Sequence, residues 1–390
     1  MATLKFNDLE FIEGSDKVKV LFLRHFYFHI DKSDLKRIGS LKVFKNCLEF
    51  DASEKRTAKF HDFLETGLNN LKNSITSKNT IYIHKASGIP LIGNGSFGIV
   101  DRGTNLIEIK PVCGCNLSCI YCSVDEDKRS VDFLIEKDYL IDELKKVVSI
   151  KKNKVEIHIG CNGEPLLYSP LIELVSDIKK MPKVIEISMD TNATLLTPLI
   201  IDKLIEAGLT RFNVSINSLD ESLAKKIAGK GYSIAHAEDM AIYISKKKVS
   251  LTLAPVWLFG INDKEIERII EFGKTLNADI GIQNFLRYQF GKNPVKEVSM
   301  EIFYDKLKAL EKKHDARLVL SADYFGIKPD NSLKKTFRKG ETVEGVLICE
   351  GRLPGERIAV ANEKTISVFG CSKKIGSKVK IRITREKHNI

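Results

Sequence analysis

The sequence predicts an α/β protein with a parallel sheet at its centre and a smaller all-β unit after it. Three observations lead to this fold class. Strand-like runs alternate with amphipathic helices between residues 106 and 300, residues 1–105 show a less regular α/β pattern, and short β runs separated by Gly and Pro follow Pro329. Parallel strands need long crossover connections, so repeated strand–helix units indicate a parallel sheet with helices packed outside it.

Residues 1–105 predict a mixed N-terminal α/β extension. A helix is expected over residues 64–75, and strands are expected over residues 80–85 and 97–102, with a turn-rich segment between the two strands. These expectations rest on hydrophobic periodicity and on the Gly and Pro residues that interrupt it. No motif in this region indicates a reaction, so the sequence leaves its role open.

The stretch from residue 106 to residue 300 contains six strand–helix units. The expected strands are 106–112, 154–160, 184–191, 211–217, 250–258 and 279–286. The expected helices are 138–150, 171–181, 199–208, 221–229, 237–248 and 266–277. Six units of this length predict a partial (β/α)6 barrel rather than a closed eight-fold barrel. Ligands of such sheets bind at the carboxyl ends of the strands.

A helix over residues 303–315 and a linker lead to the last part of the chain. The β runs expected there are 340–351, 356–363, 364–370 and 377–386. Short β runs at this spacing, separated by turns, predict a small β-barrel. The predicted domains are therefore 1–105, 106–300, 301–333 and 334–390.

Charge and composition narrow the class of protein. The chain has 390 residues and carries 62 Lys and Arg against 51 Asp and Glu, a net charge of +11. This excess favours a polyanionic partner such as RNA, although a Lys-rich soluble protein would show the same balance. We expect no membrane partner, because no apolar run is long enough to span a bilayer. The N-terminus has no secretory signal, so we expect a cytoplasmic protein with reduced thiols.

Four of the eight cysteines lie in the segment CGCNLSCIYC at residues 113–122. Cys115, Cys119 and Cys122 have the spacing C-x3-C-x2-C, and they follow the first predicted strand. Three thiolates on one short loop can bind three irons of a [4Fe–4S] cluster and leave the fourth iron open for chemistry. A zinc site with Cys113 as the fourth ligand is the alternative. We favour a buried thiol for Cys113.

The cysteine spacing, with an aromatic residue before the third Cys, resembles that of the radical S-adenosylmethionine (SAM) superfamily. After the second strand, GCNGEPLL resembles the GGEP motif of that family. After the third strand, MDTNATLL resembles its T-N-G turn, with Ala193 in place of Gly. The resemblance covers about residues 106–295. The SAM-site residues that it implies are Tyr121, Gly163, Glu164, Pro165, Thr191, Asn192, Ser215 and Asn217. Glu164 and Thr191 could instead cap the helical turns that follow them.

The resemblance implies that one electron, from a donor such as ferredoxin or flavodoxin, cleaves SAM at the open iron and forms a 5′-deoxyadenosyl radical. The cofactors that it implies are a [4Fe–4S] cluster and SAM. It does not identify a catalytic side chain. Cys161 is a candidate because it should lie near the cluster, and a methylation route with two reactive cysteines would pair it with Cys349 or Cys371.

The last segment resembles a TRAM domain, a small RNA-binding β-barrel attached to several RNA-modifying enzymes. The VEG turn, the PGE turn and the closing V-x-I-x-I strand carry this resemblance. It implies an enzyme that modifies RNA, with tRNA as the expected substrate. The RNA contacts expected are Lys335, Arg338, Lys339, Lys373, Lys374, Lys380 and Arg382.

Two other functions stay open at this stage. The same chemistry could modify a protein, a peptide or a small cofactor precursor, with the C-terminal unit serving assembly. A non-catalytic RNA-binding protein whose cluster senses iron or oxygen is the third possibility. The sequence leaves the modified atom, the natural reductant and the oligomeric state open.

Overall fold

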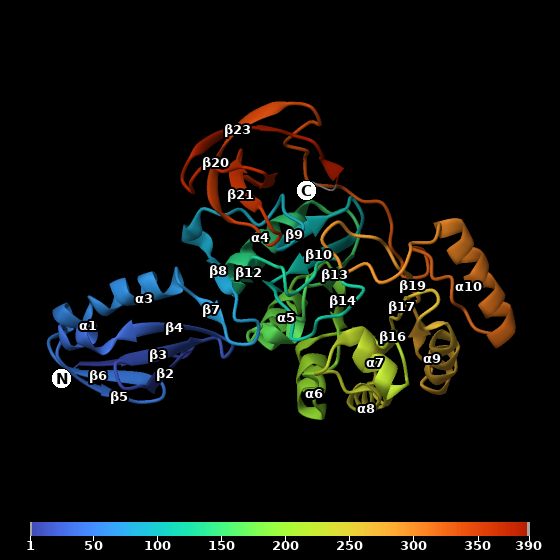
Figure 1. Cartoon of the computed structure of the whole chain (residues 1–390), viewed down its shortest axis with the longest axis horizontal. Helices are drawn as coiled ribbons and strands as arrows, with labels where there is room; N and C mark the ends of the chain where they lie inside the picture. Colours follow the sequence, from blue (N-terminus) through green and yellow to red (C-terminus); the bar gives the residue numbers. More distant parts are fainter. Residues whose placement is uncertain (1, 388–390) are drawn as a thin grey trace.

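A seven-stranded sheet in the order β18-β16-β15-β14-β13-β10-β9 organises the middle of the chain (Figure 1). The computed structural model describes residues 2–387. Six strands pair in parallel and in chain order: β10 (Leu106–Lys110), β13 (Val155–Ile159), β14 (Val184–Thr191), β15 (Arg211–Val214), β16 (Ser250–Leu253) and β18 (Asp279–Ile280). β9 (Gly98–Asp101) adds an antiparallel edge. The predicted parallel sheet with six strands in order is confirmed.

Helices cover one face of this sheet because alternate strand residues are apolar. Ile107, Ile157 and Ile187 lie side by side in register and are at most 1% exposed. The covering helices are α4 (Lys137–Ile150), α5 (Leu171–Lys179), α6 (Pro198–Ala207), α7 (Glu221–Ala228), α8 (Ile234–Ser245) and α9 (Asp263–Thr275). Each lies within a few residues of its predicted range. Most of their buried leucines, isoleucines and valines join those of the strands in one core, whereas Ile227 of α7 and Ile266 and Ile270 of α9 belong to smaller clusters.

The opposite face of the sheet carries charged and polar side chains in register. Glu108, His158 and Ser188 form one row across three strands, and Asp190 and Asn213 begin the next row. His158 Nδ1 lies 2.9 Å from Ser188 Oγ, and its Nε2 lies 3.2 Å from Asp190 Oδ2. Asn213 donates to the other carboxylate oxygen of Asp190 at 2.9 Å. This face is called the polar face below.

The helix α10 (Met300–His314) confirms the helix predicted before the linker. It packs on α9 around Phe303 and Ile270. The linker then returns along the sheet, where the buried ammonium of Lys151 donates to Asp101 Oδ1 at 2.7 Å and to the carbonyl of Asn331 at 2.7 Å. The linker is therefore tied to the sheet and not free in solution.

The N-terminal region contains more antiparallel β-structure than predicted. A small sheet consists of β1 (Ala2–Lys5), β6 (Cys47–Asp51) and β5 (Ser40–Val43). A larger one has the order β11-β12-β8-β7-β4-β3-β2, formed by β2 (Leu9–Glu13), β3 (Lys17–Phe22), β4 (Phe26–Asp31), β7 (Lys72–Asn73), β8 (Asn79–Ile83), β11 (Val112–Cys113) and β12 (Val131–Ile135). Because β11 and β12 belong to this sheet, its hydrogen bonding crosses the domain boundary predicted at residue 105.

The helix predicted over residues 64–75 is wrong in its second half. The short helices of this region are α1 (Lys32–Lys36), α2 (Glu54–Thr57) and α3 (Phe60–Leu68). The chain leaves α3 at Asn69, and Lys72 then pairs with Tyr27 of β4 and Asn79 of β8. Sheet pairing thus overrides a helical pattern that continues for two turns in the sequence.

The C-terminal residues form a four-stranded antiparallel sheet in the order β22-β21-β20-β23. Its strands are β20 (Thr342–Glu350), β21 (Glu356–Ala361), β22 (Lys364–Phe369) and β23 (Lys378–Arg382), at the four predicted places. Leu347, Ala359 and Ile381 are buried in its own core. Among the described residues, β22 and β23 each pair with one neighbouring strand and not with each other, so closure into a barrel stays a prediction. No helix among residues 2–387 combines the length and apolarity that crossing a membrane requires.

Candidate functional site

The cysteine loop, residues 114–130, lies between two paired strands. β11 runs antiparallel to β12, and β12 runs parallel to β8 of the N-terminal sheet. The end of α7 supports the middle of the loop, since Ser118 N donates to Ala228 O at 3.3 Å and Ile120 N donates to Ile227 O at 2.9 Å. The loop is therefore fixed at both ends and in its middle.

Two glycines bring the cysteine loop against the turn that follows β13. Glu164 N donates to Gly114 O at 2.9 Å, and Gly114 and Gly163 form an isolated parallel bridge. A Cβ atom at Gly163 would lie 2.0 Å from Gly114 O, where no side chain fits. Gly163 is thus required by the close approach of two loops. The GEP turn, residues 163–165, therefore lies directly beside the cysteine motif.

Cys115, Cys119 and Cys122 lie together on the loop, each partly buried. Leu117 N donates to Cys115 Sγ at 3.4 Å, and Cys119 Sγ lies 3.6 Å from Ala228 O. Burial, and then the neighbouring thiol Cys122, raises the pKa of Cys119 to about 12, and burial with Cys119 raises that of Cys115. Such thiols stay protonated at neutral pH unless a metal binds them and displaces the protons.

The three thiols match the number of protein ligands that a [4Fe–4S] cluster with one open iron takes. Within residues 2–387, no three His, Cys, Asp or Glu side chains converge on one point that a single metal ion could fill. A [4Fe–4S] cluster needs no such point, because each thiolate binds a different iron. Cys113 is fully buried, and its sulfur accepts a hydrogen bond from Phe133 N at 3.2 Å. The preferred interpretation of Cys113 as a buried thiol is confirmed.

Glu164 is almost completely buried, with 1% of the residue exposed, and its carboxylate accepts three hydrogen bonds. Oε1 accepts from Thr191 Oγ1 at 2.8 Å and from Leu166 N at 3.2 Å, and Oε2 accepts from Asn192 N at 2.8 Å. Burial raises the pKa of Glu164 to about 7, and the three donors oppose that rise. Glu164 therefore caps the turn Pro165–Leu167, as one alternative expected, and also joins β13 to the end of β14.

Asn192 links the end of β14 to the cysteine loop. Its Nδ2 donates to Asn116 Oδ1 at 2.9 Å and lies 3.8 Å from Cys115 Sγ. Its Oδ1 accepts from Thr194 N at 3.0 Å. Ala193, which replaces the Gly of the T-N-G turn, has a φ of 62° and so adopts the left-handed conformation that glycine favours. The turn geometry is kept although the residue differs.

Of the remaining expected SAM-site residues, Tyr121 lies on the cysteine loop, and Ser215 and Asn217 follow β15. Tyr121 is packed beside Ile227 and Leu258, and its hydroxyl accepts from Asn217 Nδ2 at 3.0 Å. Asn217 Oδ1 accepts from Val256 N at 2.8 Å, so both ends of this buried amide are occupied by protein groups. Ser215 is half-buried, and its N–H donates to Thr191 O at 3.0 Å. Asn217 thus orients Tyr121.

The other cysteines have separate environments, and all eight are free thiols. Cys161 is half-buried beside the cysteine loop, and burial raises its pKa above the usual range, opposed by a hydrogen bond from Val112 N. Cys349 is buried between the core of the C-terminal sheet and the rest of the molecule, whereas Cys371 and Cys47 are half-buried. The two-cysteine route stays a prediction.

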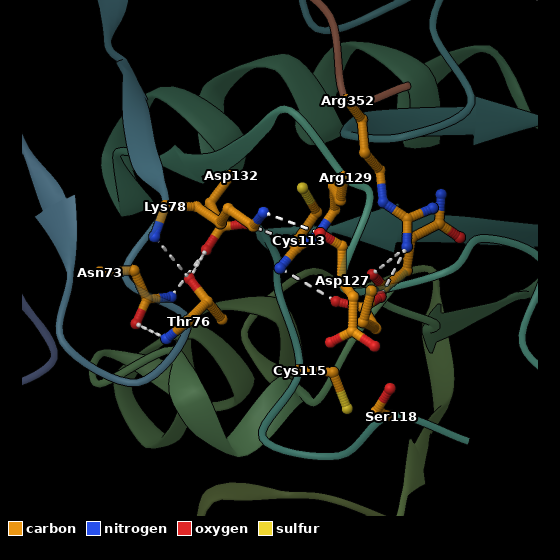
Figure 2. Close-up of polar contacts among 12 residues, drawn as sticks. Asn73, Thr76, Lys78, Cys113, Cys115, Ser118, Asp127, Arg129, Asp132 and Arg352 are labelled. Carbon is orange, nitrogen blue, oxygen red and sulfur yellow. Dashed lines mark hydrogen bonds and ion pairs between the residues drawn. The ribbon is translucent and has the colours of Figure 1, made fainter. Parts of the chain in front are cut away.

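Sequence reasoning missed a buried polar network beside the loop, shown in Figure 2. Arg129 pairs with Asp132, and its Nη2 lies 2.9 Å from Glu126 Oε2. Asn73 Nδ2 donates to Asp132 Oδ2 at 2.8 Å, and Arg352 Nη2 lies 3.2 Å from Glu126 Oε1. The network therefore joins the N-terminal sheet, the cysteine loop and the C-terminal sheet. The only sequence signal for this network is the charge-rich run DEDKRSVD, a pattern typical of a solvated loop.

The C-terminal sheet presents basic residues around two surface hollows. A hollow of about 810 Å³ is lined by Lys373, Lys378, Lys380, Arg382 and the aromatic ring of Phe369, among others. A second one, of about 360 Å³, lies between this sheet and residues 93–96. Of the other expected RNA contacts, Lys335 lines the second hollow, and Arg338, Lys339 and Lys374 are exposed without lining either.

Comparisons with known proteins identify a family model and several similar sequences. The sequence model of the Radical SAM superfamily matches residues 109–273. The uncharacterized protein MJ0103 of Methanocaldococcus jannaschii is 38% identical over 356 residues, which is 83% of this chain and 82% of that protein. The GTP 3′,8-cyclase of Listeria monocytogenes serovar 1/2a is 32% identical over 195 residues, 48% of this chain and 55% of the cyclase. The chain thus spans about half the length of the cyclases it matches.

Among solved structures, native anSMEcpe with bound AdoMet shares 18% sequence identity with this chain at a TM-score of 0.44. That match covers 67% of this chain and 77% of the other.

Proposed function

The chain belongs to the radical SAM superfamily, and from this premise we propose that it modifies RNA, with tRNA as the substrate class. The superfamily uses a [4Fe–4S] cluster and SAM, and these are the cofactors of this protein. When bound, the cluster supplies the electron that cleaves SAM and releases a 5′-deoxyadenosyl radical.

We assign the cluster to Cys115, Cys119 and Cys122. Desolvated thiols with raised pKa values need a strong cation to become thiolates, and iron provides one. Glu164 and Asn192 would hold SAM, because they connect the turn after β13 to the cysteine loop. A carboxylate beside this loop suits the cationic amino group of SAM. Asn217 acts indirectly, by holding Tyr121 against the loop.

The polar face of the sheet suits a substrate rich in hydrogen-bonding groups. The side chain of Asp190 is 52% exposed, and it is oriented by His158 and Asn213. Burial lowers the pKa of His158, but the carboxylates of Asp190 and Glu108 outweigh that effect and raise it. A charged, oriented pair on this face can recognise a base or a sugar but is a poor surface for an apolar group.

The basic C-terminal sheet is the observation that carries the RNA proposal. On β23, Lys378, Lys380 and Arg382 alternate with buried residues and so share one exposed face. Phe369 is 52% exposed at the edge of this face, and its ring stacks on Phe290 with the centroids 6.0 Å apart. Cations that follow a phosphate backbone, combined with an exposed aromatic ring for base stacking, are typical of single-stranded nucleic-acid surfaces.

A small guanine nucleotide is the second candidate substrate. The match to GTP 3′,8-cyclases over 195 residues favours it, because half of this chain resembles enzymes named for acting on GTP. In that case the basic C-terminal sheet would not be needed for substrate binding. A protein or peptide substrate has no comparable support from the surface described here.

One experiment separates these candidates. The protein is reconstituted with iron and sulfide under anaerobic conditions and reduced, and 5′-deoxyadenosine is measured with bulk tRNA, with GTP and with neither. We expect faster formation with tRNA, accompanied by a mass shift in a nucleoside digest. Faster formation with GTP alone would replace tRNA by a nucleotide. An iron-loaded protein that forms no 5′-deoxyadenosine would contradict the enzyme and favour the sensor.

The role of the exposed basic residues of β23 is tested by reversing two of their charges. The double variant Lys380→Glu, Arg382→Glu is expected to weaken tRNA binding at least ~10-fold and to reduce its salt dependence. Cleavage of SAM in the absence of RNA should stay unchanged, since neither residue lies at the cysteine loop. Unchanged tRNA affinity in this variant would remove the C-terminal sheet from RNA binding.

A further inference from the structure

The cysteine loop lines a surface hollow of about 390 Å³. Cys115, Ser118 and Asp127 come from the loop itself, Ile75 and Lys78 come from the turn between β7 and β8, and the remaining wall includes residues 229–231 after α7. In the view of Figure 2, Cys115 and Ser118 lie below Asp127, and Arg352 lies above it. A proposed cluster ligand therefore borders a hollow that opens to solvent.

The rim of this hollow is positively charged. Lys78 and Lys230 line it, Lys128 follows Asp127 with its side chain 77% exposed, and Lys292 Nζ donates to Ser118 Oγ at 2.6 Å. The acidic residues near it contribute less. Asp127 is exposed, but Asp125 and Glu126 are buried, and Glu126 is neutralised by two arginines. Lys78 and Lys230 are thus lining residues, whereas Lys128 and Lys292 lie beside the hollow and pair with its acids: Lys128 Nζ is 3.5 Å from Asp125 Oδ2, and Lys292 Nζ is 3.4 Å from Asp127 Oδ2 and 3.6 Å from Asp125 Oδ1.

These side chains are held in place rather than spread at random over the surface. Lys78 Nζ donates to Asp127 O at 3.2 Å, and Thr76 Oγ1 donates to the buried carboxylate of Asp132 at 2.7 Å. Ile75, in the same turn, is 39% exposed and offers an apolar contact to a docked protein. The rim therefore combines ordered cations with one apolar residue, beside the place where an electron must enter.

We propose that this hollow, with Lys78 and Lys230 in its wall and Lys128 and Lys292 beside it, is the docking site of an acidic one-electron carrier protein. The carrier is oxidised by one electron and the cluster is reduced by one electron, with no bond made or broken and no proton transferred. Electron-transfer partners form small, weak interfaces, and opposite charges steer them together. The lysine rim supplies this steering for an acidic carrier at the surface nearest Cys115.

RNA fits this hollow less well than an acidic protein does. Its lining residues include no aromatic side chain on which a base could stack, whereas the C-terminal sheet presents Phe369. The two basic surfaces are lined by different residues, since none of the residues that line the hollow also lines the 810 Å³ hollow of the C-terminal sheet. An enzyme that uses both surfaces could receive electrons while its substrate is bound.

The test compares a purified acidic ferredoxin with dithionite as reductants of the reconstituted cluster. The variant is Lys128→Glu combined with Lys230→Glu, and the readout is the rate at which the cluster absorbance bleaches, without SAM and without RNA. We expect the ferredoxin rate of the variant to fall about 10-fold at low ionic strength, and the dithionite rate to stay unchanged. The wild-type ferredoxin rate should itself decrease as salt is added.

A matched control reverses two lysines elsewhere. The side chains of Lys145, on α4, and Lys180, directly after α5, are 59% and 72% exposed. Like Lys128, each has a carboxylate three residues earlier. Their reversal to Glu should leave both reduction rates unchanged. Equal ferredoxin rates in wild type and the Lys128, Lys230 variant would overturn the proposal. A selective loss of tRNA binding in that variant would also overturn it, by assigning the surface to the substrate.

This inference rests on the cluster assignment but not on the identity of the substrate. Iron content and the absorbance spectrum, recorded before reduction, establish whether the cluster is present. A loaded cluster that ferredoxin reduces equally well in every variant contradicts only the docking site. An absent cluster contradicts the ligand assignment, and a missing RNA product contradicts only the proposed function.

Discussion

At the scale of single residues, the candidate site is defined by groups that water would normally solvate but that the fold has buried. Glu164, Cys115 and Cys119 are the main examples, and burial is the largest cause of the raised pKa of each. Burial disfavours the ionised form of an acid. A cationic partner would favour the ionised form of each group, and in the proposed function this partner is iron for the thiols and the amino group of SAM for Glu164.

The titration of Glu164 gives a prediction about stability without cofactors. Its pKa is about 7 in the folded protein against an ordinary value of 4.5, so the folded state holds this proton more tightly than the unfolded state. The free energy of unfolding should therefore fall as the pH rises from about 4.5 to about 7, by about 3 kcal/mol at most. Below that window Glu164 is protonated in both the folded and the unfolded state, so its titration no longer changes the free energy of unfolding.

Urea unfolding of the cofactor-free protein across this pH range measures the effect. Glu164→Gln removes the titrating group, so the difference between wild type and variant isolates it from other groups. The wild type should lose stability relative to the variant between pH 5 and pH 8. Parallel pH profiles would show that Glu164 ionises normally in the folded protein.

The cluster assignment predicts different effects for two neighbouring cysteines. Cys119→Ala removes a proposed ligand and should lower the iron bound after reconstitution to near background. Cys113→Ala is the matched control, because Cys113 lies in the same motif but is buried in the core. This variant should keep its iron and lose about 1 kcal/mol of stability from the small cavity. Full iron content in Cys119→Ala would refute the assignment.

At the scale of elements, the site is made by turns at strand ends that approach one another closely. The turn after β13 touches the cysteine loop at Gly163 and Gly114, and the turn after β14 reaches the same loop through Asn192. The strands bring these turns to one edge because all of them run in the same direction. Sequence reasoning missed β12, which flanks the cysteine loop, because its five buried residues VDFLI show no alternation of buried and exposed positions.

The Gly163 contact predicts a steric effect. In Gly163→Ala the new methyl would lie 2.0 Å from Gly114 O, so one of the two loops must move. We expect a loss of about 3 kcal/mol in stability and a lower iron content, because the cysteine loop shifts. Gly231→Ala is the control, since no atom lies within 4 Å of its Cβ position and its backbone suits alanine. Equal thermal unfolding of both variants would contradict this packing.

At the scale of the whole molecule, three regions meet at the cysteine loop instead of being linked loosely. The N-terminal sheet continues into β12 and β11, and Asn73 binds Asp132 beside the loop. The C-terminal sheet reaches the same place through Arg352, whose Nη2 also donates to Asn162 O at 2.9 Å. Both outer regions therefore contribute to the position of the loop.

The contact of Arg352 with Glu126 predicts that the C-terminal sheet helps to hold the cysteine loop in position. Arg352→Ala leaves the buried carboxylate of Glu126 with one partner fewer, and removing one partner of a buried pair costs about 3 kcal/mol. We expect faster proteolysis within residues 334–390 and weaker binding of SAM. Arg357→Ala is the control, because Arg357 pairs with Glu350 inside the sheet. If the two variants resist proteolysis and bind SAM equally, Arg352 does not connect the sheet to the site.

The sequence by itself determined the local chemistry and the order of the central strands. Thiol spacing, the GEP turn and the alternation of β and α periods are local patterns, so Cys119, Gly163 and the six parallel strands could be predicted from them. Only the tertiary structure decided what surrounds the loop. The Asn73–Asp132 and Glu126–Arg352 contacts join residues 59 and 226 positions apart. Such contacts depend on how whole sheets pack, and no local pattern in a single sequence records that packing.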